Sequence, residues 1–405
     1  MAIEITSAAD LLDRVHTVPG GVHLLDGPNT LDYAVTLLAA AHGRCAAVPL
    51  NTRASAAEID AVRAITARRE LPPGIYISTS GSQGEPKLVA LTPDALFRHA
   101  HAVNAHLEVN AQDTWLACLP FFHVGGMAVI LRCAAAGAKL CIVPRPDAET
   151  VHEQLDACTL VSLVPTVLRR LLTLRPNGLP ASVRAVVLGG GPVPLDLIER
   201  CPQVLPTYGL TEAGSMVTCA RPRCAESERT TAGIPLPGAA VRIVDENGHD
   251  VATGTVGRIL AQSSGAASGY IENENETART FRAGWIQTED AGYLDWAGCL
   301  HVVGRRDRII VCGGENIALD EIETALRAIA PVSDALCIAL DEPEWGQIPG
   351  AVIETPNAIK LAELRAALRA LLAPHKLPRA VRCVTALPLL PNGKPDYVAA
   401  RRLFG

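Results

Sequence analysis

The chain has 405 residues, of which 49% are apolar and 19% are charged, and its net charge is −6. This length allows two or three domains with a large core, and the composition excludes a disordered or highly charged chain. The mild acidity, without any long run of Lys and Arg, gives no electrostatic reason to expect a nucleic-acid partner.

The first 200 residues alternate between helical patterns and short β-rich runs, which is typical of α/β layering. One predicted helix, over residues 55–69, begins with Ser55 as N-cap and Glu58 in the capping-box position. The other helices are expected at 31–42 and 93–107. Strands are expected at 45–51, 74–79, 139–144, 160–165 and 184–190.

The most apolar segment, residues 115–131, is a poor candidate for a membrane span. It contains Pro120, His123 and two glycines, and Arg132 follows it at once. A spanning helix needs about 20 consecutive apolar residues. We therefore expect a buried strand, a loop and a core helix here, and no membrane span.

From about residue 230 the pattern becomes all-β, with apolar runs at 241–248, 257–263 and 299–305. Beyond Asp307 the expected elements are a hairpin at 308–314, strands at 335–342 and 350–355, and helices at 318–329 and 361–372. In the last helix, one apolar face is expected to contain Leu361, Leu364, Leu368 and Leu371. The sequence thus predicts an α/β fold with two domains. Residues 1–306 would form a large N-terminal domain of layered α/β subdomains plus a β-rich subdomain, and residues 307–405 a small α+β C-terminal domain.

The cysteines and the N-terminus indicate the cellular compartment. Twelve cysteines are scattered along the chain without a C-x-x-C pair. At this length the pattern is typical of buried thiols in a reducing cytosol, rather than of a disulfide framework or a zinc site. The N-terminus carries early acidic residues and lacks the apolar stretch of a signal peptide, so we expect a cytoplasmic protein.

Residues 77–87, ISTSGSQGEPK, follow the apolar start of a predicted strand and combine two glycines, four hydroxyl side chains and a lysine. A phosphate chain is held by backbone N–H groups, hydroxyls and a cation, and glycines let the backbone come close. The segment is not a Walker loop, because no G-K-[ST] occurs in the chain. Taken alone, such a segment is more often an ordinary surface turn.

Three later segments change this interpretation. They are YGLTE at 208–212, GWIQTEDAGYLDWAGCLHVVGRRDRIIVCGGENI at 284–317, and PNGK at 391–394. With TSGSQGEPK at 79–87 they form four ordered motifs, and in these motifs the chain resembles the adenylate-forming superfamily of acyl-CoA synthetases, adenylation domains and luciferases. The resemblance covers residues 75–397 and implies an enzyme that activates a carboxylate as acyl-AMP, with ATP and Mg²⁺ as requirements.

The resemblance also implies site residues. The ATP or AMP site would contain Thr79, Ser80, Gly81, Ser82, Gly84, Lys87, Gly190, Gly191, Tyr208, Gly209, Asp290 and Arg305. Glu212 is a suitable hard ligand for Mg²⁺ on the phosphates, and Thr211 can donate to a phosphate oxygen. Lys394 would bridge the carboxylate and the α-phosphate during adenylation. The acyl pocket would be lined by His123, Gly125 and Met216, although a lone His in an apolar run is usually a core residue.

A second group of residues concerns the thiol acceptor. By resemblance, Asp307 would be the hinge of a mobile C-terminal domain. Rotation about Asp307 would remove Lys394 from the active site and present Gly313 and Gly314 to the thiol. Two adjacent glycines could let a pantetheine arm pass the backbone. The G-G-E-N-I version at 313–317 favours CoA as acceptor, while a carrier-protein phosphopantetheine would use the same channel.

Two stretches, LPFFHVGGMAVILR and YGLTEAGSMVTCARP, resemble the o-succinylbenzoate–CoA ligase family. Three features depart from the common pattern: Gln83 replaces a loop threonine, Glu289 replaces the glycine before Asp290, and only about 75 residues precede the phosphate loop. We expect an ATP-dependent acid–thiol ligase, with o-succinylbenzoate as the first candidate acid. Aryl- or fatty-acid–CoA ligases, an enzyme loading a carrier protein, and a non-catalytic nucleotide- or acyl-binding relative stay open, as does a homodimer.

Overall fold

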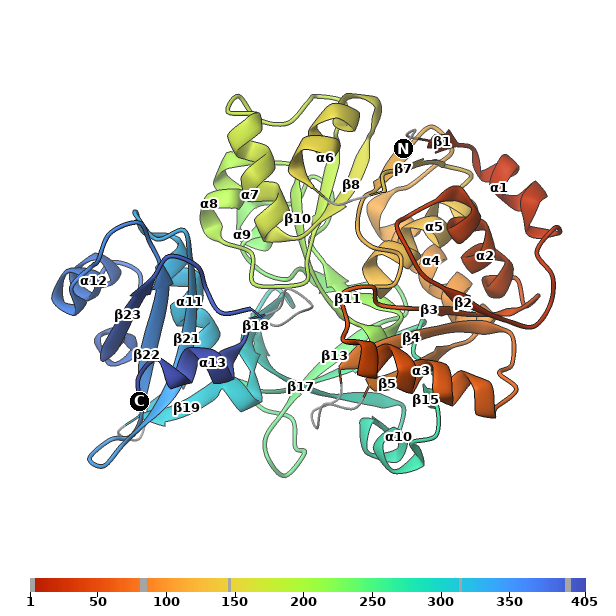
Figure 1. Cartoon of the computed structure of the whole chain (residues 1–405). Helices are drawn as coiled ribbons and strands as arrows, with labels where there is room; N and C mark the ends of the chain where they lie inside the picture. The colour runs from red at the N-terminus through yellow and green to blue at the C-terminus, as the bar shows by residue number, and fades with distance from the viewer. Residues whose placement is uncertain (1–3, 81–85, 145–146, 313–314, 390–394) are drawn as a thin grey trace. The chain divides into compact units, whose positions relative to one another are not determined.

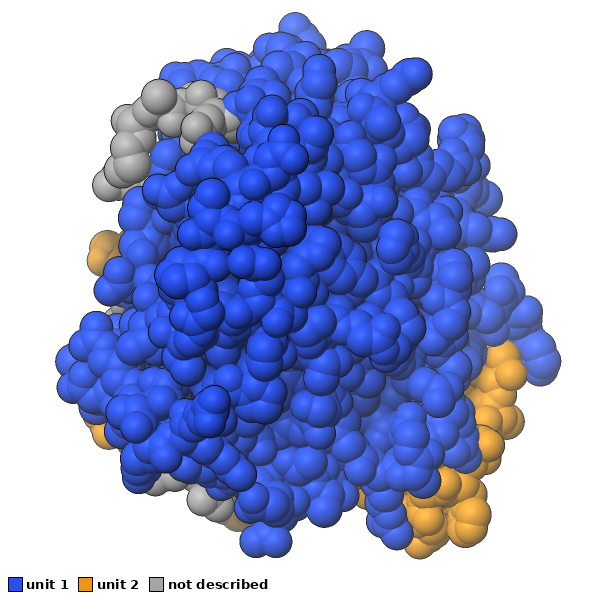
Figure 2. Space-filling model, turned by 90° about the vertical axis from the view of Figure 1, so that its right-hand side faces the viewer, with its two compact units in different colours: residues 1–242, 260–288, 294–301 blue, residues 243–259, 289–293, 302–405 orange. Residues whose placement is uncertain are grey.

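The computed structural model describes residues 4–80, 86–144, 147–312, 315–389 and 395–405 (Figure 1). It divides into two compact units, which Figure 2 shows in different colours. Unit 1 consists of Met1–Arg242, Leu260–Thr288 and Leu294–His301, and unit 2 of Ile243–Ile259, Glu289–Tyr293 and Val302–Gly405.

The larger sheet of unit 1 has eight strands in the order β1-β7-β6-β8-β9-β10-β11-β12. Its central strands are parallel, from β7 through β10, and they read as continuous apolar runs because both of their faces are covered. The bounds are β1 Glu4–Thr6, β6 Thr114–Ala117, β7 Lys139–Ile142, β8 Leu160–Leu163, β9 Ala185–Leu188, β10 Val204–Leu210, β11 Ser215–Cys219 and β12 Ile234–Pro235.

A second sheet of unit 1 has five strands in the order β15-β5-β4-β3-β2. Strands β2, β3 and β4 are parallel, whereas β4 and β5 form an antiparallel pair and β15 lies antiparallel beside β5. The bounds are β2 Val22–Leu25, β3 Ala46–Pro49, β4 Gly74–Ser80, β5 Pro86–Leu91 and β15 Gly269–Tyr270.

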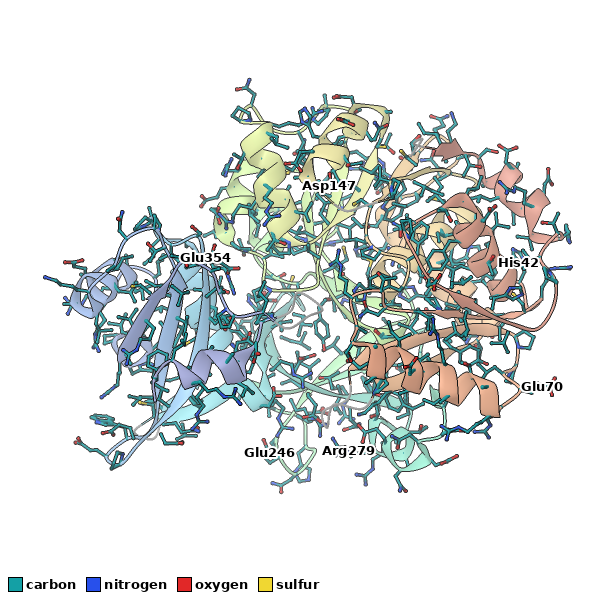
Figure 3. All side chains as sticks on the ribbon, in the orientation of Figure 1. His42, Glu70, Asp147, Glu246, Arg279 and Glu354 are labelled. Carbon is teal, nitrogen blue, oxygen red and sulfur yellow. The ribbon has the colours of Figure 1, made fainter. Side chains whose placement is uncertain are left out.

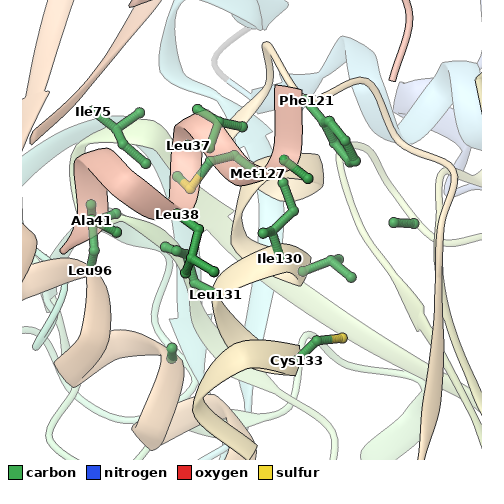
Figure 4. Packing of buried hydrophobic residues seen from close by; sticks show 14 of the residues in the cluster. Leu37, Leu38, Ala41, Ile75, Leu96, Phe121, Met127, Ile130, Leu131 and Cys133 are labelled. Atoms are coloured by element: carbon green, nitrogen blue, oxygen red, sulfur yellow. The ribbon is translucent and has the colours of Figure 1, made fainter. Parts of the chain in front are cut away.

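The two sheets share one core, which is filled by helices α2 (Leu31–Ala41), α4 (Pro93–Leu107) and α5 (Val124–Ala136). Figure 4 shows Leu37 and Leu38 of α2 beside Met127 and Ile130 of α5, and each of these side chains is fully buried. Each contributes about 1.5–3 kcal/mol relative to an exposed position. Because strand side chains alternate between faces, Leu116 turns to the opposite core with helices α6 (Ala148–Gln154), α7 (Pro165–Leu174) and α8 (Leu195–Arg200).

The predicted elements of this part are confirmed with small shifts in their ends. Helix α3 (Ala56–Arg68) has the expected capping box, in which Ser55 and Glu58 bond to each other's backbone N–H groups. The apolar segment 115–131 forms strand β6 and the start of helix α5, as expected. In the part of the chain that the structure describes, no helix is long and apolar enough to cross a membrane.

A third sheet, of order β13-β14-β17-β16 with β18 beside β17, contains strands with residues in both units. Its bounds are β13 Ala240–Val244, β14 Gly257–Gln262, β16 Phe281–Arg282, β17 Trp285–Leu294 and β18 Leu300–Arg305. The expectation of an all-β pattern beyond residue 230 is wrong at one place. Helix α10 (Glu274–Thr280) forms there, because the Asn273 side chain accepts from the backbone N–H of Glu276 and caps its first turn.

Unit 2 contains the C-terminal sheet, of order β20-β19-β22-β21 with β23 beside β22. Its elements are β19 Ile309–Cys312, β20 Glu315–Ala318, α11 Leu319–Arg327, β21 Asp334–Glu342, β22 Gly346–Glu354, α12 Leu361–Leu368, β23 Ala380–Val384 and α13 Tyr397–Arg402. Leu364 and Leu368 of α12 enter the core as expected. Leu371 does not, since it is 51% exposed. The assigned helix ends at Leu368, and Leu372, whose N–H donates to the Leu368 carbonyl over 2.9 Å, is buried in place of Leu371.

The remaining short elements are helices α1 (Ala8–Val15) and α9 (Glu226–Arg229) and the 3-10 turns η1 (Leu155–Ala157), η2 (Thr211–Ala213), η3 (Arg306–Arg308) and η4 (Pro374–Lys376). All twelve cysteines lie among the described residues as free thiols, and ten of them are buried.

Candidate functional site

The β4–β5 hairpin forms the base of the predicted phosphate loop. Thr79 pairs with Lys87 across the two strands, and the Thr79 hydroxyl donates to the Lys87 carbonyl over 3.5 Å. Ser80 ends β4 and pairs with Pro86. Gly81, Ser82, Gln83 and Gly84 lie outside the described residues, as does the side chain of Ser80. The hairpin therefore holds Thr79 and Lys87 at neighbouring positions, next to the segment expected to bind phosphate.

Lys87 lies in a cluster of half-buried groups. Its Nζ forms an ion pair with the Glu276 carboxylate of helix α10, and the two side chains are only 19% and 18% exposed. The same Nζ lies 5.3 Å from the ring centroid of Tyr270. The hydrogen bond from Lys87 lowers the pKa of Glu276, so the carboxylate is charged at neutral pH. Arg279, labelled in Figure 3, is a second cation at 3.6 Å from Glu276.

Glu212 lies in the same cluster. It belongs to turn η2, directly after strand β10, and its Oε1 accepts a 2.8 Å hydrogen bond from the Tyr270 hydroxyl. Its carbonyl accepts from the N–H of Ala267, in the segment that leads to Tyr270. The structure thus brings the predicted metal carboxylate and the predicted phosphate lysine to one tyrosine. Thr211 precedes Glu212 in turn η2.

Four predicted site residues lie at the carboxyl ends of the parallel strands, the edge at which open α/β sheets bind ligands. They are Gly190, Gly191, Tyr208 and Gly209. Gly190 and Gly191 follow β9, and Gly190 has φ +79°, which favours glycine. Tyr208 and Gly209 lie at a bulge near the end of β10. A Cβ on Gly209 would lie 2.1 Å from the Ser215 carbonyl oxygen, so only glycine fits there.

Asp290 and Arg305, predicted to hold the ribose, both belong to unit 2. Burial lowers the pKa of Arg305, but the hydrogen bond and charge of Asp307 and the charges of Asp290 and Glu289 raise it overall. Asp290 and Arg305 are therefore close enough to interact. The added charge of Glu289 has a partner, since its carboxylate lies 3.0 Å from Arg258.

Asp307, the predicted hinge, lies in turn η3 and is paired with Arg305 at 3.2 Å. Lys394, Gly313 and Gly314 lie outside the described residues. Cys312 and Glu315, on either side of the two glycines, pair across β19 and β20. Leu389 and Pro395, on either side of the PNGK segment, form an antiparallel bridge.

The predicted acyl-pocket residues lie on two elements of unit 1. His123 is the N-cap residue of α5 and is exposed, so the alternative of a core histidine does not hold. Gly125 is partly buried in the first turn of α5, where a Cβ would make only ordinary contact with Leu119. Met216 is buried on β11, opposite Gly209.

The sequence did not single out a buried polar group beside Met216. Arg132 of α5 is 1% exposed, and its Nη2 donates to the Ser215 hydroxyl over 3.0 Å. Its Nε makes no hydrogen bond within the described part of the chain. Burial and the Arg132 charge lower the pKa of His99 to about 4, so this histidine is neutral and bonds to the Met216 carbonyl. The sequence feature that could have identified this group is Arg132 itself, the one charged residue in the otherwise apolar segment 124–136.

The Glu212 carboxylate, in the cluster with Tyr270 and Lys87, fits a magnesium ion. Mg²⁺ is usually bound by one or two carboxylates together with substrate phosphates and water, and not by a cage of protein ligands. Among the described residues no group of three or more His, Cys, Asp or Glu side chains could hold a metal. Glu212 supplies a hard oxygen at the end of β10, within the cluster that contains Lys87.

Comparison with known proteins identifies the family. Residues 74–271 match the AMP-binding enzyme family, and residues 321–394 match the AMP-binding enzyme C-terminal domain. The 2-succinylbenzoate–CoA ligases of Bacillus cereus and Bacillus anthracis are each 34% identical to the chain over 319 residues. These matches span 77% of this chain and 66% of each relative, which is just under two thirds of the relatives' length.

Solved structures agree with this assignment. The o-succinylbenzoate CoA synthetase (MenE) of Bacillus subtilis in complex with the acyl-adenylate intermediate OSB-AMP has a TM-score of 0.86 and 25% identity, over 97% of this chain and 92% of that one. The same synthetase in complex with ATP and magnesium ion has a TM-score of 0.83, over 98% and 92%. The chain therefore belongs to the family of AMP-binding, adenylate-forming enzymes.

Proposed function

We propose that the protein is an AMP-forming acid–thiol ligase, which activates a small carboxylic acid with ATP and transfers the acyl group to CoA. The observation that carries this proposal is the cluster in which Tyr270 contacts both Lys87 and Glu212. A cation and a hard carboxylate are needed on the two sides of a phosphate chain, because positioning and charge neutralisation dominate the chemistry of phosphoryl groups. The similarity to a synthetase bound to its acyl-adenylate supports the same reaction.

The residues would divide the work as follows. Thr79 and Lys87 would bind phosphate oxygens, Glu212 would hold Mg²⁺, and the ion when bound would neutralise charge on the phosphates. Asp290 would accept hydrogen bonds from the ribose hydroxyls, with Arg305 beside it. Lys394 keeps its proposed role between the carboxylate and the α-phosphate. We also keep the proposed division at residues 306 and 307, with Asp307 as the hinge.

The proposed acid carries a second carboxylate. Arg132 is a cation buried almost completely, and within the described part of the chain it contacts the Ser215 hydroxyl and the Trp115 ring but no carboxylate. A buried charge is costly unless it is paired, and a guanidinium pairs well with a carboxylate. Beside the buried Met216, such a group suits an acid that keeps one carboxylate after the other is activated. 2-Succinylbenzoate, the acid in the names of the relatives, has this property.

Acid-dependent exchange of pyrophosphate into ATP tests the activity. We expect exchange with 2-succinylbenzoate, and exchange at least about tenfold weaker with benzoates and short to medium fatty acids. No exchange with any acid would refute adenylation, and preference for a monocarboxylate would refute the proposed substrate. Comparing free CoA with a phosphopantetheinylated carrier protein as acceptor then decides between the two thiols, of which we propose CoA. The twelve free thiols fit the reducing, cytoplasmic compartment proposed from the sequence.

A further inference from the structure

Tyr270 is the residue at which the two charges of the phosphate site meet, although the sequence motifs did not include it. Its hydroxyl donates to Glu212 Oε1 over 2.8 Å, and its ring lies 5.3 Å from Lys87 Nζ. The residues so joined are 58 and 183 positions away in the sequence. Tyr270 is only 9% exposed, so water competes little for these contacts.

The local structure holds Tyr270 in one place. Strand β15 pairs Tyr270 with Val89 of β5, the strand that begins with Pro86 and Lys87. The Tyr270 N–H donates to the Thr277 hydroxyl over 2.9 Å, and that hydroxyl donates to the Asn273 carbonyl. Helix α10 is thereby fixed beside β15, and it presents Glu276 to Lys87.

The tyrosine hydroxyl is a dependable donor to the carboxylate. The Tyr270 hydroxyl carries one proton, which it donates to Glu212 Oε1 over 2.8 Å, and a carboxylate oxygen can only accept it. A carboxylate that accepts a hydrogen bond on one oxygen has a fixed orientation, and its other oxygen stays available to a metal ion. Partners of this kind outside the metal's own ligands typically change metal affinity by about 10- to 100-fold.

We propose that Tyr270 is a positioning residue for the metal carboxylate: its hydroxyl holds Glu212 so that Oε2 binds the ion, while its ring supports Lys87. The proposal rests on the proposed function, because it assumes that ATP and a divalent cation bind to this cluster. Tyr270 itself touches neither the acid nor the reacting atoms in this assignment. It acts through Glu212 and Lys87.

Binding of Mn²⁺ in the presence of ATP tests the proposal without turnover. Since ATP alone also binds Mn²⁺, the free Mn²⁺ signal in electron paramagnetic resonance is compared with and without the full chain at one ATP concentration, and the difference gives the apparent Kd. Tyr270→Phe removes the hydroxyl and keeps the ring near Lys87, so we expect the Kd for Mn²⁺ to rise roughly tenfold. Tyr76→Phe is the matched control, because the Tyr76 hydroxyl is also buried but donates only to the Pro72 carbonyl. It should leave the Kd unchanged.

A double-substitution cycle separates positioning from general damage. In a Glu212→Gln background the carboxylate is already lost, so Tyr270→Phe should change the Kd by less than about twofold. Equal Mn²⁺ binding by the wild type and Tyr270→Phe, or an equal loss in Tyr76→Phe, would overturn the proposal and leave the ligase function standing. A wild-type chain that binds no Mn²⁺ with ATP would overturn the proposed function and this inference together.

Discussion

Two regions of unit 1 differ in how their charged side chains are paired. Around Tyr270 the cation is paired with an anion: Lys87 forms an ion pair with Glu276, and Glu212 accepts a hydrogen bond from the tyrosine hydroxyl. Beside Met216, Arg132 is buried without a carboxylate partner in the described part of the chain: its Nη2 donates to the Ser215 hydroxyl, its guanidinium lies 5.4 Å from the Trp115 ring centroid, and its Nε makes no hydrogen bond there. The region proposed for the phosphates therefore holds its cation in an ion pair, whereas the cation in the region proposed for the acid has no carboxylate partner among the described residues.

The difference has a consequence for binding. A phosphate that binds Lys87 must replace the ion pair between Lys87 and Glu276. The net gain in binding free energy is therefore the difference between two similar interactions. A carboxylate that reaches Arg132 breaks no ion pair of the described residues and can use the Nε that makes no hydrogen bond. Specificity for the acid should therefore exceed specificity for the nucleotide, because a buried charge strongly rejects a ligand that leaves it unpaired.

Replacing the unpaired cation should have the largest effect. In Arg132→Met we expect kcat/KM for 2-succinylbenzoate to fall roughly 100-fold, since hydrogen bonds to charged groups contribute about 1.5–3 kcal/mol. Thermal stability should stay equal or rise, because a buried arginine is exchanged for an apolar chain of similar length. Arg98→Met, at an exposed position on α4, is the control. Unchanged discrimination against benzoates would remove Arg132 from the acid site.

The pH dependence of stability reports on the burial of His99 and, to a smaller extent, on the nearby Arg132 charge. The pKa of His99 is about 4 in the folded chain, against an ordinary value of 6.5. Between these values the unfolded chain binds a proton that the folded chain does not, so stability falls as the pH falls from 6.5 to 4, by about 3 kcal/mol. His99→Gln should flatten this slope in urea unfolding, and Arg132→Met should reduce it. The exposed His101→Gln should do neither, and a slope unchanged in His99→Gln would contradict the assignment.

Unpairing Lys87 should have a smaller effect. In Glu276→Gln we expect the free energy of unfolding at pH 7 to fall by about 1–2 kcal/mol. Because the folded pKa of Glu276 is lowered, this contribution is present above the ordinary Glu pKa and disappears as the pH falls through the folded value. Glu274→Gln, on the exposed side of α10, is the matched control. Equal stability of both variants at pH 7 would show that the phosphate region is not pre-paired.

Local patterns predicted the elements of the fold well. The capping box of α3 and the strand periods of the two α/β sheets depend on neighbours in sequence, and the structure has them. Helix α10 was not predicted, because its seven residues are too few to show the helical period of apolar side chains. The apolar face of α12 was extrapolated past Leu368, where the helix ends, and so Leu371 was placed in the core in error.

The site shows a similar limit. Lys87 and Glu212 were named from motifs, but their meeting depends on a strand and a helix that come much later in the chain. Tyr270 and Glu276 carry no motif that points to them. Their roles come from contacts across 58 to 189 positions, which no local pattern contains.

The bulge between Tyr208 and Gly209 limits how this enzyme can be redesigned. Ser215, which pairs with Leu210 directly after the bulge, has φ +138°, a conformation that costs a non-glycine residue on the order of 1–3 kcal/mol. Substitution libraries aimed at a new acid should therefore hold Gly209 and Ser215 constant and vary Met216 and Arg132 together. In libraries that vary all four positions, most members would be chains in which strand β11 cannot pair with β10.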